Sequence, residues 1–76
     1  MKKTPEQIEF EQIYKQYSGR IYSFAMVISK GDTYLSEEIL QTTFTKLWEH
    51  WGNLKSQDRV LSYLFTTAKN TFVNYC

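Results

Sequence analysis

Two sets of polar side chains are the parts of this sequence best suited to binding another molecule. The first combines acids, an amide and hydroxyls at three- and four-residue spacing: Glu37, Glu38, Gln41, Thr42 and Thr45. The second shares one side of the last helical segment, with Lys55, Arg59 and Lys69 beside it: Tyr63, Thr66, Thr67, Asn70 and Asn74. An acidic helix face can dock a basic partner helix, whereas amides, hydroxyls and a tyrosine can contact bases. From spacing alone, an ordinary solvated helix face is the simpler interpretation of both patterns.

The residues that usually carry catalysis are sparse and scattered. His50 is the only histidine and has no nucleophile near it in the sequence. Glu37 and Glu38 are adjacent, so on a helix they point about 100° apart and do not form a carboxylate pair. There is no Gly-rich phosphate loop, and the single cysteine, Cys76, is the last residue. We therefore expect no enzymatic activity, no metal site and no cofactor.

The first helical segment begins with Thr4-Pro5-Glu6-Gln7, in which Thr4 and Gln7 can form a capping box and Pro5 suits the first turn. Apolar residues follow at helical spacing, and Ser18-Gly19 interrupts them, which predicts a bend or a break. Gly31 is placed to end the segment in a left-handed conformation. The expected core positions are Phe10, Ile13, Tyr14, Tyr17, Ile21, Phe24, Ala25 and Ile28.

Two further helices are predicted downstream. Asp32 can cap the first of them, which should end at Gly52-Asn53, and Ser56 or Asp58 can cap the last. Their expected core stripes are Leu35, Ile39, Leu40, Phe44, Leu47, Trp48 and Trp51, then Leu61, Leu64, Phe65, Ala68, Phe72 and Val73. No segment alternates with period two. The sequence therefore predicts an all-α fold, a compact bundle of three to four helices.

Size and charge limit the function classes. The 76 residues form one predicted domain, 1–76, with 42% hydrophobic and 17% aromatic residues, enough for a small core. The net charge is +1, divided as −1 over residues 1–38 and +2 over residues 39–76. A strong binder of duplex DNA usually has a denser basic face. No apolar run approaches the roughly 20 residues of a membrane span, so we expect a cytoplasmic protein.

The order of several motifs resembles region 2 of the extracytoplasmic-function (ECF) sigma factors, in the sigma-70 family. The stretch from Ser36 to Glu49, SEEILQTTFTKLWE, is similar to the signature of that region. The aromatic residues between Phe10 and Ala25 fit its opening helices. The segment from Ser62 to Asn70 fits its downstream motif. The resemblance extends over nearly the whole chain.

The resemblance implies a bacterial transcription-initiation factor with two partners. Its polar helix face would bind the clamp helices of the RNA polymerase β′ subunit, here through Glu37, Glu38 and Gln41. Its specificity loop and last helix would hold the minus-ten promoter element as single-stranded non-template DNA. The corresponding positions are Lys55, Ser56, Gln57, Asp58 and Arg59 for the loop, with Tyr63, Thr67 and Asn70 on the helix. An anti-sigma factor is a further candidate partner.

Two departures from the family pattern matter. An acid usually follows the glutamine, and Thr42 stands there instead, which would remove a charge-assisted contact worth about 1–3 kcal/mol if buried. Family members also continue into a helix-turn-helix domain, so we expect this chain to be a fragment or an isolated domain. Two alternatives remain open: a helical protein-interaction module without DNA binding, and a helix-turn-helix repressor. Lys69, the only clear cation within the last helix, argues against the repressor.

Overall fold

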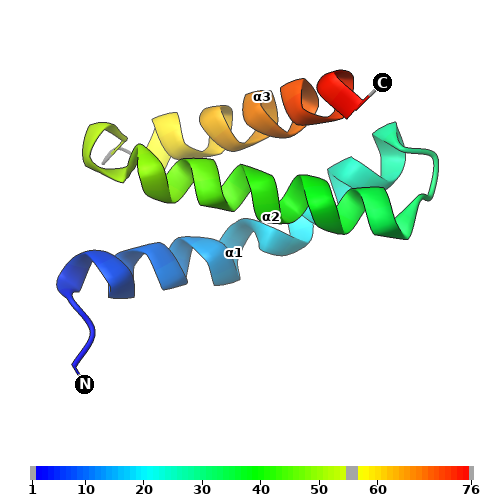
Figure 1. The fold of residues 1–76 in the computed structure, drawn as a ribbon. Helices are drawn as coiled ribbons and strands as arrows, with labels where there is room; N and C mark the ends of the chain where they lie inside the picture. Colours follow the sequence, from blue (N-terminus) through cyan, green and yellow to red (C-terminus); the bar gives the residue numbers. More distant parts are fainter. Residues whose placement is uncertain (1, 55–56, 76) are drawn as a thin grey trace.

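Three α-helices and one short 3₁₀ helix form the part of the chain that the computed structural model describes, residues 2–54 and 57–75, without the side chains of residues 57 and 58. The elements are α1 (Pro5–Ile28), α2 (Thr33–Glu49), η1 (Trp51–Asn53) and α3 (Gln57–Tyr75). Figure 1 shows the helices running alongside one another, and each packs against the other two. The prediction of an all-α bundle is confirmed.

The caps of α1 and α2 follow from the local sequence. Thr4 Oγ1 accepts a hydrogen bond from the Gln7 N–H at 3.1 Å, and Gln7 Oε1 accepts one from the Thr4 N–H at 2.9 Å. This reciprocal pair is the predicted capping box, with Pro5 in the first turn. Asp32 Oδ1 caps α2 by accepting from the Leu35 N–H at 2.9 Å. Both helices therefore begin where their polar signals predict.

The turn between α1 and α2 has two left-handed residues. Gly31 has a φ of 87°, as its predicted role requires, and its N–H donates to the Met26 carbonyl oxygen at 2.8 Å. Lys30 precedes it with a φ of 58°, a conformation that costs more for a residue with a Cβ. The predicted break at Ser18-Gly19 does not occur, because α1 is helical throughout. Packing of the segments on both sides against α2 and α3 outweighs the low helix propensity of one glycine.

The core lies along the line where the three helices meet. Six of its side chains are completely buried, with 0% exposure: Ile21, Ala25, Ile39, Leu47, Leu64 and Ala68. Phe24 of α1 packs edge-on against Phe65 of α3, with ring centroids 5.2 Å apart. Within the described ranges, no helix is both long and apolar enough to cross a membrane. Burial of these apolar surfaces is the main stabilising contribution in so small a bundle.

Candidate functional site

The first polar set lies together on the outer side of α2. Glu37, Gln41 and Thr45 are exposed, whereas Glu38 and Thr42 are half-buried. The opposite side of the helix packs into the bundle through Ser36, Ile39, Thr43, Phe44 and Leu47. We call the outer surface the polar face of α2. Its acidic end is at Glu37 and Glu38, and its hydroxyl-rich end is at Thr45.

Glu38 is not a free carboxylate, because the end of α3 contacts it. The Tyr75 hydroxyl donates a hydrogen bond to Glu38 Oε2 at 3.2 Å. Partial loss of hydration raises the pKa of the Tyr75 phenol above its ordinary value of 10.0. The negative charge of Glu38 and this hydrogen bond raise the pKa further. Sequence reasoning missed Tyr75. No periodic pattern connects two residues that are 37 positions apart.

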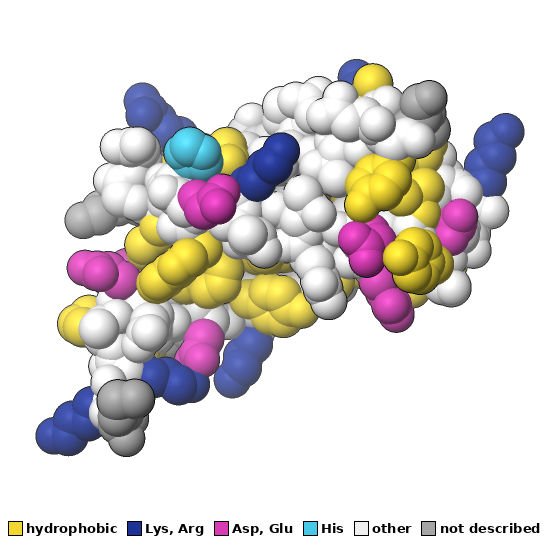
Figure 2. Space-filling model, in the orientation of Figure 1, with side chains coloured by type: hydrophobic (Ala, Val, Ile, Leu, Met, Phe, Trp, Pro, Cys, Tyr) yellow, Lys and Arg dark blue, Asp and Glu magenta, His cyan; other side chains and the backbone are white. Residues whose placement is uncertain are grey.

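A row of aromatic side chains borders the polar face of α2 on the side of α1. Phe10 and Tyr14 of α1 meet Phe44 and Trp48 of α2, with ring centroids 5.1 Å apart for Phe10 and Trp48 and 4.8 Å apart for Tyr14 and Phe44. These four residues form what we call the aromatic groove. Figure 2 shows hydrophobic side chains gathered along this seam between α1 and α2. The prediction that Trp48 belongs to the core was wrong, because Trp48 is 41% exposed.

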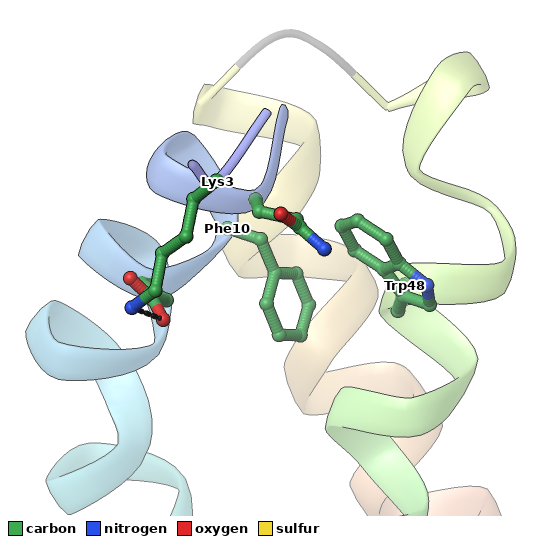
Figure 3. A pocket seen from close by; sticks show the side chains of 5 residues that line it. Lys3, Phe10 and Trp48 are labelled. Carbon is green, nitrogen blue, oxygen red and sulfur yellow. Dashed lines mark hydrogen bonds and ion pairs between the residues drawn. The ribbon is translucent and has the colours of Figure 1, made fainter. Parts of the chain in front are cut away.

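The aromatic groove contains two adjoining surface hollows of ≈ 390 Å³ each. One reaches the polar face of α2, since Gln41 and Thr45 line it together with the four aromatic residues. The other is lined by Phe10 and Trp48 together with Lys3, Gln7 and Glu11, and Figure 3 shows the Phe10 ring between Lys3 and Trp48. Lys3 and Glu11 form an ion pair there. A binding partner on the polar face would therefore also meet apolar surface.

The second polar set is only partly exposed on α3. Arg59, Thr66, Asn70 and Asn74 face solvent, and Tyr63 is half-buried. The Tyr63 hydroxyl donates to the Lys46 carbonyl oxygen of α2 at 3.4 Å. The structure thus brings the exposed members together along one helix. The specificity-loop positions Lys55 and Ser56 lie outside the described residues, as do the side chains of Gln57 and Asp58 and the predicted caps among them.

Thr67 was predicted on the exposed side of α3, and this prediction was wrong. The side chain is only 8% exposed, and its carbonyl oxygen accepts a hydrogen bond from the Thr71 hydroxyl at 2.8 Å. The buried stripe of α3 consists of Val60, Leu64, Thr67, Ala68 and Thr71. Val73, predicted as a core position, is 57% exposed. Threonine can be buried in a helix when its hydroxyl bonds to the preceding turn. A stripe predicted from hydrophobic residues alone therefore omitted the buried threonines of α3.

No group of three or more potential metal-ligating side chains occurs within residues 2–54 and 57–75. His50, which sequence reasoning left without a role, lies at the end of α2. Its ring packs against Tyr63 of α3 with centroids 6.2 Å apart and an interplanar angle of 62°. Because the two residues come from different helices, sequence spacing gave no signal for this contact.

The family model for sigma-70 region 2 matches residues 13–76 of the chain. The match covers most of the sequence and includes all of α2, η1 and α3. The chain therefore belongs to the sigma-70 region 2 family, whose members bind RNA polymerase and recognise the minus-ten promoter element in transcription initiation. The search found no matching protein of curated function and no matching solved structure.

Proposed function

We propose that this domain comes from a sigma factor of the ECF type and that it uses separate helices for its two partners. The polar face of α2 binds the β′ clamp helices of RNA polymerase. The exposed side of α3 holds the minus-ten element as single-stranded non-template DNA. The main support is that Gln41 and Thr45 are exposed on α2, while Thr66, Asn70 and Asn74 are exposed on α3.

Docking on α2 relies on three kinds of contact. Glu37 and Glu38 offer carboxylates to cationic side chains of the partner, and Gln41 can donate and accept hydrogen bonds. Thr42 carries no charge where the family usually has an acid. The aromatic groove lies directly beside Gln41 and Thr45 and can receive an apolar side chain of the same partner helix. Apolar contact at this edge compensates for the missing charge.

DNA binding on α3 relies on groups that suit unpaired bases. Asn70 and Asn74 carry amides that can bond to base edges, and Thr66 adds a hydroxyl. Arg59 provides a cation for a phosphate at the beginning of the helix. Extruding a base from the duplex costs a few kcal/mol, and such contacts can recover that cost once the strand is open. The domain thereby favours the melted promoter.

The test of docking is fluorescence anisotropy of a labelled β′ clamp-helix fragment with wild type, Glu38→Arg and Glu9→Arg. Glu9→Arg controls for the charge change, which it makes at an exposed position on α1, and circular dichroism verifies that Glu38→Arg stays folded without the hydrogen bond from Tyr75. We expect saturable binding by wild type and by the control, and at least about tenfold weaker binding by Glu38→Arg. Equal binding by all three proteins would remove the polar face of α2 from the docking surface.

The alternative is a helical protein-interaction module without DNA binding. The aromatic groove favours it, because exposed aromatic side chains are typical of protein interfaces. The two functions differ in their response to salt. Binding of a minus-ten oligonucleotide that weakens as salt rises supports the sigma-factor function, and no oligonucleotide binding by the folded protein supports the interaction module.

A further inference from the structure

His50 and Tyr63 form an aromatic corner where α2 ends and α3 passes. Their ring centroids lie 6.2 Å apart, and the ring planes meet at 62°. Tyr63 is half-buried, and its hydroxyl is turned toward the Lys46 carbonyl oxygen at 3.4 Å. His50 is exposed and follows the last residue of α2. The packed tyrosine therefore provides a fixed wall, and the histidine provides a second wall on the solvent side.

Two aromatic rings at this angle suit a planar base. A base stacked on one ring presents its edge or face to the other, and both stacked and edge-to-face arrangements are favourable between aromatic groups. Unpaired bases stack on tyrosine and histidine in many single-strand binding proteins. Paired bases inside a duplex cannot enter such a corner. The corner therefore fits a single strand rather than a double helix.

The surrounding charges suit the backbone of that strand. Lys46 lies one helical turn before His50 on α2, and Arg59 lies one turn before Tyr63 on α3. Both cations are exposed and can contact phosphates on either side of a stacked base. Glu49, also exposed, is the acid next to His50 in the sequence, and it disfavours a phosphate directly over the histidine ring.

The corner also continues the exposed side of α3. Thr66 and Asn70 follow Tyr63 at three- and four-residue intervals, so they extend along the same side of the helix. A strand that binds these side chains would reach Tyr63 and His50 at its end. We propose that His50 contacts DNA and, with Tyr63, forms a two-walled stacking site for one unpaired base. This inference rests on the proposed binding of single-stranded promoter DNA.

The test uses single-stranded minus-ten oligonucleotides that carry 2-aminopurine at each position in turn, because stacking changes the fluorescence of this base. Affinity, its dependence on salt and the 2-aminopurine signal are measured for wild type, His50→Ala and His50→Phe. Gln16→Ala serves as a control at an exposed position on α1. Circular dichroism verifies that all the variants are folded.

We expect His50→Ala to weaken binding by roughly 5- to 150-fold, the range for loss of one base–aromatic stack. The 2-aminopurine signal should disappear at one position, with the salt slope unchanged. His50→Phe should restore both, because it retains the aromatic face. Gln16→Ala should bind like wild type.

Three results would overturn the stacking role. His50→Ala could bind like wild type, which would remove His50 from the interface while leaving DNA binding intact. His50→Ala could lower the salt slope by about 1 without rescue by phenylalanine, which would show a phosphate contact. Absence of binding by folded wild type would refute the proposed DNA binding itself, and the inference with it.

Discussion

The two seams that border α2 differ in chemistry. The seam with α1 is aromatic and partly open, with Phe10 and Trp48 around hollows of ≈ 390 Å³. The seam with α3 is polar, and its hollow of ≈ 250 Å³ is lined by Thr42, Lys46, Thr71, Asn74 and Tyr75. An aromatic seam suits apolar side chains of a protein partner, whereas a polar seam with a cation suits nucleic acid. The aromatic seam is therefore suited to a protein partner alone, whereas the polar hollow is lined by residues of both sets, Thr42 of the polar face of α2 and Asn74 of α3.

Phe44→Ala should cause the largest loss of stability and tests the structural part of the aromatic seam. The Phe44 side chain is 4% exposed and contacts both Phe10 and Tyr14, so its removal leaves a cavity. We expect a loss of about 3–5 kcal/mol in the free energy of unfolding, measured by urea titration followed by circular dichroism. Trp48→Ala, which removes a 41% exposed ring, should cost clearly less. Equal losses would show that both residues are structural.

Asn70→Ala tests whether the exposed side of α3 reads bases. Loss of an amide that bonds to a base should weaken oligonucleotide binding by about 1–3 kcal/mol, and only for the sequences that carry that base. Anisotropy with a panel of single-base variants of the minus-ten oligonucleotide measures this. A loss that is uniform across the panel would assign Asn70 to the DNA backbone instead.

Thr71→Val tests the polar interior of α3. The substitution keeps the shape of the side chain but removes the hydrogen bond from its hydroxyl to the Thr67 carbonyl oxygen. We expect a loss of about 0.5–1.5 kcal/mol in the free energy of unfolding. Thr66→Val at an exposed neighbouring position is the control and should change stability by less than about 0.5 kcal/mol. A neutral or stabilising Thr71→Val would show that apolar burial outweighs the hydrogen bond.

Tyr75→Phe should have the smallest effect on the free energy of unfolding. It tests the hydrogen bond that the Tyr75 hydroxyl at the end of α3 donates to Glu38 of α2. The raised pKa of Tyr75 means that the protonated phenol's contribution to the stability of the fold is fully present below pH 10.0. This contribution is lost as the pH rises through the pKa of Tyr75 in the folded state. An ultraviolet absorbance titration of wild type, minus that of Tyr75→Phe, isolates this phenol. Ionisation of Tyr75 at or below its ordinary pKa would show that the hydrogen bond to Glu38 does not persist in solution.

Local signals in the sequence predicted the elements well. The capping box at Thr4, the cap at Asp32 and the left-handed Gly31 depend on neighbouring residues, and the structure contains all three. The apolar periodicity also indicated that Ile39 and Leu47 are buried. A glycine within α1, by contrast, predicted an interruption that packing overrides. Propensity is a weak signal when both flanking turns contact a core.

The candidate site was harder to predict because it depends on contacts between helices. Exposure of Gln41 and Thr45 on α2 could be inferred from periodicity. The exposure of Trp48 and the burial of Thr67 could not, since both depend on how closely the neighbouring helices approach. The partners of Glu38 and of His50 come from α3, and no spacing rule connects them. Sequence periodicity identifies the faces of a helix but not what lies against them.

The most direct test of two partners on two helices measures Glu38→Arg and Asn70→Ala each against both ligands. Anisotropy gives the affinity of each variant for the β′ clamp-helix fragment and for the minus-ten oligonucleotide. We predict that Glu38→Arg loses the clamp fragment and retains the oligonucleotide, and that Asn70→Ala does the reverse. If each variant, still folded by circular dichroism, weakened both ligands to the same degree, α2 and α3 would form one shared surface and their separate roles would be contradicted.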